Sequence, residues 1–213
     1  MDDIETICAN SFRDFHAKGF DYLCLTRSPE LTRKVYFFEG DLVDLPEIVM
    51  PHDHRYGFTT TVLAGAVRNR TFSRIDLKTA HPAAIQAYLA EGTRTLPVHD
   101  RFSYSTPLNG GDGFTWEGED LLLEDTRRGA YTRHQSYRST PTDIHTLDIR
   151  CEGTVILLEQ GPDEVPLDGT TTAWRLKGDR TPPDTAGLYE RMVPDHARRR
   201  ITQFLDLIGN RIP

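Results

Sequence analysis

The chain has 213 residues, of which 38% are hydrophobic and 27% are charged, and its formal net charge is −7 with histidine neutral. This apolar share suffices for a sizeable core and excludes a wholly disordered chain. The acidic balance disfavours a nucleic-acid binder, and no apolar run approaches the ~20 residues of a membrane helix. Because the start MDDIETICANSF lacks the pattern of a secretory signal, we expect a cytoplasmic protein.

Helical periodicity marks the two ends of the chain. Apolar residues recur at helical spacing over 3–18, and Gly19 is a plausible stop. Near the other end we expect a helix over 195–209, capped by Asp195 and ended by Gly209. The apolar stripe of this second helix consists of Ile201, Phe204, Leu205 and Ile208.

Between the helices, short β-branched and aromatic runs alternate with turn residues, a pattern typical of an antiparallel sandwich or barrel. The predicted strands are 34–38, 58–67, 70–75, 120–125, 145–149, 154–160 and 170–176. A predicted helix at 82–92 and a Gly/Asn-rich loop at 108–113 interrupt them. The absence of a Gly-rich phosphate loop and of strand–helix alternation disfavours a dinucleotide-binding fold.

We therefore predict a mainly β fold formed by a single domain over 1–213. In this domain an antiparallel barrel at 30–178 carries an insertion at 76–118 over one mouth. Helices at 1–19 and 195–209 flank the barrel.

The most informative stretch is Pro51-His52-Asp53-His54. Side chains at i and i+2 of a strand share a face, so His52 and His54 can aim two imidazoles at one point inside the barrel. A third metal ligand must then come from another strand. We favour His145, which opens a strand after the turn TPTD, over His134. Two surface histidines on an edge strand are the alternative interpretation of the pair.

The segments PHDHRYGFTTTVLAG and STPTDIHTL together resemble the two motifs of the cupin superfamily. The first supplies His-x-His and a closing Gly65, and the second supplies a turn with Pro141 followed by His145. The usual motif Glu is absent, so the chain resembles the three-histidine subset, which includes cysteine dioxygenase and related thiol dioxygenases. The resemblance covers roughly 45–160. It implies a cupin-like double-stranded β-helix, a metal centre, an oxygenase activity and a homodimer.

Three neutral imidazoles leave a divalent metal with its full charge and with open positions for substrate and dioxygen. We expect Fe(II), while Ni, Cu, Mn and Zn stay open because affinity order alone favours copper and zinc. An anionic bidentate substrate would compensate the charge. A thiol is the leading expectation, beside an enediolate or a hydroxy acid.

Strand alternation also predicts neighbours of the site. Tyr56 would point inward and hydrogen-bond bound substrate or oxygen, although an aromatic filling the core is an equal alternative. Arg68 and Arg70 share a face and would clamp a carboxylate if that face is inward. Tyr137 is a further candidate for substrate binding, and His134 a candidate acid or base. The remaining histidines, His16, His81, His99 and His196, are expected to be structural or exposed.

The sequence thus predicts a mononuclear non-haem metal dioxygenase that acts on a small chelating substrate. Two alternatives stay open: a metal-dependent cupin isomerase or lyase, and a cupin that binds a ligand without turnover. A nucleic-acid partner and a membrane partner are not expected.

Overall fold

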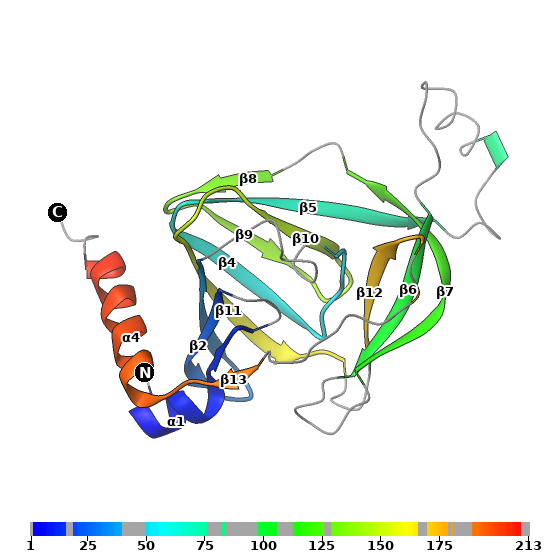
Figure 1. Cartoon of the computed structure of the whole chain (residues 1–213). Coiled ribbons are helices and arrows are strands. Elements are labelled where there is room, and N and C mark those ends of the chain that lie inside the picture. The colour runs from blue at the N-terminus through cyan, green and yellow to red at the C-terminus, as the bar shows by residue number, and fades with distance from the viewer. Residues whose placement is uncertain are drawn as a thin grey trace.

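The structure is a computed structural model that describes residues 2–15, 19–39, 50–75, 82–83, 98–105, 113–125, 129–165, 170–178, 180 and 189–209. Two antiparallel sheets face one another in this part of the chain, and the two terminal helices pack together beside one of them (Figure 1). None of the helices described there is long and apolar enough to cross a bilayer.

The first sheet has the strand order β13-β1-β2-β3-β11-β4-β9. Its strands are β1 (Phe12–Arg13), β2 (Phe20–Arg27), β3 (Thr32–Phe38), β4 (Tyr56–Ala64), β9 (Ser136–Ser139), β11 (Thr154–Asp163) and β13 (Glu190–Arg191). The second sheet has the order β10-β5-β7-β6-β12, and β8 also pairs with β5. Its strands are β5 (Ala66–Ile75), β6 (Val98–Ser105), β7 (Gly113–Glu124), β8 (Gly129–Thr132), β10 (Ile144–Ile149) and β12 (Thr171–Leu176).

Residues 50–53, here called the strap, complete a central fold of eight elements. His52 in the strap forms isolated antiparallel bridges to His145 of β10 and to Ala173 of β12. In chain order the central elements are β3, the strap, β4, β5, β8, β9, β10 and β11. Numbered 1 to 8 in this chain order, they pair as 1-8-3-6 in the first sheet (β3-β11-β4-β9) and as 2-7-4-5 in the second (strap-β10-β5-β8). This is the jelly-roll order of cupins. The predicted mainly β, cupin-like fold with terminal helices is confirmed.

The described part of the predicted insertion extends the second sheet. β6 and β7 pair with each other, and the end of β7 pairs with the end of β5. β12 then pairs with β6, and the strap links β12 back to β10. The second sheet therefore curls around so that the strap touches both of its ends. Of the predicted helix at 82–92, only Pro82 and Ala83 lie within the described residues, and both are helical.

The first sheet separates two apolar clusters. Between the two sheets lies an inner cluster rich in aromatic side chains, to which the second sheet contributes Val67 and the first sheet Phe12, Phe20, Tyr22, Cys24, Tyr36, Phe38, Phe58, Val62, Tyr137, Ile156 and Leu158. The outer face of the first sheet packs against the terminal helices through Ile7, Leu23, Leu25, Val35, Phe37, Leu63, Val155, Met192, Ala197 and Phe204. The central strands β2 and β3 are thus buried on both faces, which explains their nearly continuous apolar runs.

The N-terminal helix is shorter than predicted. α1 spans Ile4–Asn10, and Asp3 caps it by accepting hydrogen bonds from the backbone N–H groups of Glu5 and Thr6. The chain then enters β1, where Phe12 pairs with Tyr22 and joins the inner cluster. Phe12 and Phe15 fit a helical period, but burial of their rings in the barrel determines the local structure.

The C-terminal helix α4 spans Pro194–Gly209. The backbone N–H of Ala197 donates to the Val193 carbonyl, so the helix begins before Asp195, which lies in its first turn instead of capping it. Phe204 is buried, but Leu205 is 45% exposed, and Leu207 packs against the outer cluster instead. The buried stripe is therefore rotated slightly from the predicted one.

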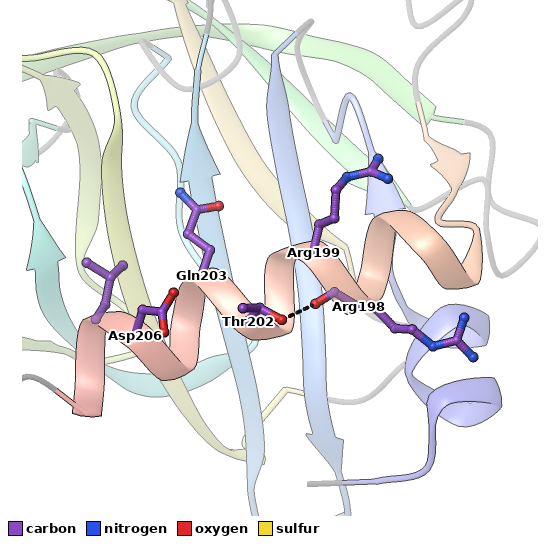
Figure 2. A pocket seen from close by; sticks show the side chains of 6 residues that line it. Arg198, Arg199, Thr202, Gln203 and Asp206 are labelled. Carbon is purple, nitrogen blue, oxygen red and sulfur yellow. Dashed lines mark hydrogen bonds between the residues drawn. The ribbon is translucent and has the colours of Figure 1, made fainter.

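Arg200 fixes α4 to the first sheet. Its guanidinium bonds Asp21 of β2 at 2.8 Å and forms two hydrogen bonds to the Glu39 carboxylate at 2.7 and 2.8 Å. The basic run 198–200 therefore does not lie wholly on a solvated face. Arg198 and Arg199 do extend from the helix into solvent, beside a shallow open hollow that Thr202, Gln203 and Asp206 also line (Figure 2).

Candidate metal centre

Backbone pairing brings His52 and His145 together. The N–H of His52 donates to the His145 carbonyl at 2.9 Å, and the N–H of His145 donates back to the His52 carbonyl at 3.0 Å. Directly opposite residues of an antiparallel pair place their side chains on the same face. The two imidazoles consequently lie side by side, with ring centroids 5.0 Å apart.

His54 follows two residues later and joins the same group. Its backbone N–H donates to the Pro141 carbonyl, in the turn that precedes β10. Its ring centroid lies 4.8 Å from that of His52 and 5.1 Å from that of His145. The ring pair is thus close, as predicted from i, i+2 spacing, although regular strand β4 begins only at Tyr56.

The three side chains can each offer one nitrogen, and these nitrogens lie within 4.8 Å of one another. The Nε2 atoms of His54 and His145 are 2.9 Å apart. Two ligands held at ~2.1 Å from one metal and at about 90° to each other would be roughly 3.0 Å apart. The His54–His145 spacing therefore fits two neighbouring positions around a metal ion.

Contacts at Nδ1 orient two of the rings. His52 Nδ1 lies 2.9 Å from the Met50 carbonyl, and His145 Nδ1 lies 2.7 Å from Oδ1 of Asn69. Both partners accept hydrogen bonds, which assigns the imidazole proton to Nδ1 in each ring. Nε2 is then the lone-pair nitrogen of both residues, as a metal ligand requires.

Asn69 was not predicted as a site residue. It is buried in β5 and lies diagonally across from His145, whose direct partner in the β5–β10 pair is Thr71. The amide between two arginines is the sequence signal that could have identified it, because a buried strand rarely keeps a polar side chain without a partner.

Burial keeps the centre in the form that binds metal. His145 is 3% exposed, and its pKa lies well below the usual 6.5, mainly because burial disfavours the charged imidazolium and secondly because His52 is close. Phe58 covers the rings of His54 and His145 at centroid distances of 4.8 and 5.5 Å. His52 and His54 are only half-buried, so the centre is accessible from one side.

Asp53 anchors the strap on the side away from β10. Its carboxylate accepts a hydrogen bond from the backbone N–H of Thr172 at 2.6 Å, and its own N–H donates to the Thr172 carbonyl at 3.0 Å. Burial raises the pKa of this carboxyl. The residue between the two histidines thus points away from the imidazole group and fixes the strap to β12.

Tyr56 lies beside the imidazole of His54. Its ring centroid is 5.5 Å from that of His54, and its phenol oxygen accepts a hydrogen bond from Nζ of Lys34 at 3.2 Å. Tyr137 also points into the barrel, where its ring lies 4.8 Å from that of Tyr131. Burial raises the pKa of the Tyr137 phenol.

The structure does not bring Arg68 and Arg70 to the centre. Val67 of β5 joins the inner cluster and Asn69 contacts His145, so the alternate residues Arg68 and Arg70 point to the other face. There the Glu124 carboxylate binds Arg70 through two hydrogen bonds of 2.9 and 2.8 Å and raises its pKa. A carboxylate clamp would need the two arginines on the inward face of β5, but they lie on its other face.

His134 also lies apart from the other three histidines. It occupies the exposed turn between β8 and β9 with a positive φ of 70°, and its N–H donates to the Val62 carbonyl. Val62 is six residues along β4 from Tyr56, which corresponds to roughly 20 Å of extended strand. This turn places His134 near the far end of β4.

Of the other histidines, His99 is buried in β6, and His196 binds the Asp21 carboxylate at 2.6 Å. Both have structural surroundings, as expected. His16 and His81 lie outside the described residues.

No protein-family model and no curated protein matches the chain. Solved structures similar to it include hydroxypropylphosphonic acid epoxidase from S. wedmorenis, with 11% identity and a TM-score of 0.36 over 71% of this chain and 53% of that one. A structure of Fe(II) HppE matches with 12% identity and a TM-score of 0.32, over 67% of this chain and 49% of that one. The chain spans about half the length of these proteins. At this distance neither supports an argument about function.

Proposed function

We propose that the protein is a mononuclear non-haem iron oxygenase of the cupin type, a dioxygenase for a small chelating substrate, with Fe(II) held by His52, His54 and His145. The observation that carries this proposal is the convergence of the three imidazoles, two of them oriented by acceptors at Nδ1. A group so arranged offers three nitrogen donors within 4.8 Å of one another.

The donor set fits a catalytic metal better than a structural one. A structural zinc site is usually closed by four protein ligands, whereas three leave positions open for exogenous molecules. Nitrogen donors suit Fe(II), and they also suit Ni, Cu and Zn, so metal identity must be measured. When bound, Fe(II) would supply the redox chemistry by which dioxygen reacts with a chelated substrate.

The protein side chains would orient the substrate and exclude water. Phe58 covers the inner side of His54 and His145 and would keep water from that side of the metal. Tyr56, next to His54, would hydrogen-bond the substrate from the adjoining position on β4. Apolar surroundings with a few polar groups, as Phe58 and Tyr56 provide here, are typical of the lining of a small-molecule site.

Oxygen uptake tests the proposal. Protein loaded anaerobically with Fe(II) is mixed with oxygenated buffer and either 3-mercaptopropionate, a thiol, or lactate, a hydroxy acid. We expect uptake that depends on one of these substrates and is lost in His54→Ala, while His134→Ala, which removes an exposed imidazole, retains it. Stoichiometric iron without substrate-dependent uptake would contradict an oxygenase and favour the isomerase or ligand-binding alternatives.

A further inference from the structure

A lysine lies inside the barrel without a carboxylate partner. Lys34 of β3 is 8% exposed. Its Nζ donates to the Tyr56 hydroxyl at 3.2 Å and lies 4.7 and 5.7 Å from the ring centroids of Tyr56 and Tyr22. Within the described ranges, no Asp or Glu forms an ion pair with it. Lysine is rarely so buried unless it is paired, so this position needs an explanation.

Strand register places Lys34 on the inner face of the first sheet. Four residues on neighbouring strands form one row across the sheet. Lys34 pairs with Leu158 of β11, Leu158 pairs with Thr60 of β4, and Thr60 pairs with Tyr137 of β9. Leu158 and Tyr137 belong to the inner cluster, and so does Tyr36, two residues from Lys34 on the same face of β3. The ammonium group therefore points between the two sheets.

Tyr56 connects this ammonium group to the candidate metal centre. The Tyr56 ring contacts the His54 ring on one side, and its hydroxyl accepts the Lys34 hydrogen bond on the other. Lys34 Cα is level with Thr60, four residues along β4 from Tyr56, so the side chains of Lys34 and Tyr56 lean toward each other. The ring of Tyr56 thus lies between the Lys34 ammonium group and His54, a proposed metal ligand.

Two further polar groups lie in the same row. Thr60 Oγ1 and Tyr137 OH are both buried and face one another across β4 and β9, where the Thr60 hydroxyl partly offsets the effect of burial on the pKa of the Tyr137 phenol. Buried polar atoms in proteins are nearly always satisfied, by protein, water or ligand. The inner face of the first sheet therefore carries two polar hydroxyl groups in the same row as an uncompensated positive charge.

Aromatic contacts alone leave much of the Lys34 ammonium unsatisfied. An ammonium has three donors, and Tyr56 accepts one of them. The rings of Tyr22 and Tyr56 add cation–π attraction, but they carry no net negative charge. A divalent ion held by three neutral imidazoles would add further positive charge on the other side of Tyr56. An anion would compensate both.

We propose that Lys34, together with the Tyr56 hydroxyl, binds the oxyanion of the substrate, a carboxylate or a phosphate-type group, while the chelating end of that substrate lies at the three imidazoles. This inference rests on the proposed function for its second half only. It assigns the substrate class, a small anion bearing an oxyanion group, and names Lys34 as the residue that selects it.

Calorimetric titration of the folded protein tests the inference. The probes are lactate, inorganic phosphate and the uncharged 1,2-propanediol, each titrated into wild type, Lys34→Met and Lys177→Met. Methionine replaces the buried charge by an apolar chain of similar length, a change that proteins usually tolerate. Lys177→Met is the matched control, because Lys177 is exposed and pairs with Glu119.

We expect wild type and Lys177→Met to bind at least one anion and not the diol. Lys34→Met should weaken anion binding on the order of tenfold to a hundredfold, the range for a lost charge-assisted hydrogen bond. Tyr56→Phe should weaken it less. Tighter binding of lactate identifies a carboxylate, and tighter binding of phosphate identifies a phosphate-type substrate.

The same titrations on metal-free protein separate this inference from the proposed function. Should the protein prove to bind no iron, Lys34-dependent anion binding in the metal-free form would still support the anion site. Equal affinity in wild type and Lys34→Met, or no anion binding by wild type in either form, would overturn it. Near-ultraviolet circular dichroism of Lys34→Met and Tyr56→Phe verifies that the core is intact.

Discussion

His52 and His145 exchange two backbone hydrogen bonds, so sheet formation alone places their imidazoles together. The third imidazole belongs to His54, which follows His52 by two residues and lies just after the strap. The candidate ligands are therefore positioned by the jelly-roll fold before any metal binds.

Removal of metal should leave the fold intact. Because backbone pairing holds the ligands, treatment with a chelator should preserve the near-ultraviolet circular dichroism spectrum. It should reduce the free energy of unfolding only by the binding term, about 2.7 kcal/mol where free metal was at 100 times its Kd. Thermal unfolding with and without metal measures this. Loss of the folded spectrum on chelation would indicate instead that the metal organises the centre.

Asn69→Leu should weaken metal binding. The substitution removes the acceptor that orients His145, and such outer contacts typically account for about tenfold to a hundredfold in metal affinity. Competition with a chromophoric chelator measures the affinity. Asn69→Asp, which retains an acceptor oxygen at the same position, is the matched variant and should bind more tightly than Asn69→Leu. Equal metal affinity in Asn69→Leu and wild type would contradict the role assigned to Asn69.

Gly65→Ala should destabilise the β4–β5 hairpin more than Gly153→Ala. Both glycines have φ near +70°, but an added Cβ at Gly65 would lie 2.9 Å from Thr154 Cα and closer still to its hydroxyl, whereas Gly153 has open space. Backbone strain should cost about 1–3 kcal/mol at both sites, and the clash should add about 1–3 kcal/mol at Gly65 alone. Urea unfolding gives both free energies, and equal losses would exclude the close approach.

Acid should weaken the attachment of α4. Hydrogen bonds from Arg200 lower the pKa of Glu39 below 4.5, so this carboxylate contributes stability above pH 4.5 that is lost as the pH falls through its folded pKa. Glu39 is well exposed, so the contribution is small. Urea unfolding across pH 3–6 measures it. Glu39→Gln should flatten that part of the profile, and an unchanged slope would contradict the assignment.

Seven of the described strands and the three histidines were predictable because each leaves a strong local signal, whereas β1, β2, β6, β8, β9 and β13 were not predicted. His-x-His after Pro51, and a lone His145 after a Pro-containing turn, indicate ligands without knowledge of pairing. Seven predicted strands correspond to described ones, including β10 and β11 with bounds within a few residues.

Two kinds of feature were not predictable: which residues of a strand face inward, and how deeply a side chain is buried. The run Arg68-Asn69-Arg70 alternates whichever face is inner, and only the pairing of β5 with β10 determines that Asn69 points inward. Lys34 sits within an apolar run, but lysine is so commonly exposed that its burial could not be inferred. Phe12 fits a helix and a strand equally well, and contact with Tyr22 decided the outcome.

The most direct test of the central claim is metal content measured by inductively coupled plasma mass spectrometry on wild type, on His52→Ala, His54→Ala and His145→Ala, and on His134→Ala as the matched control. With three converging imidazoles, wild type and His134→Ala should hold about one metal ion per chain, and each of the other three substitutions should reduce occupancy to near zero. Unchanged occupancy in His145→Ala, or wild-type protein that takes up no metal when Fe(II) is supplied, would contradict the account.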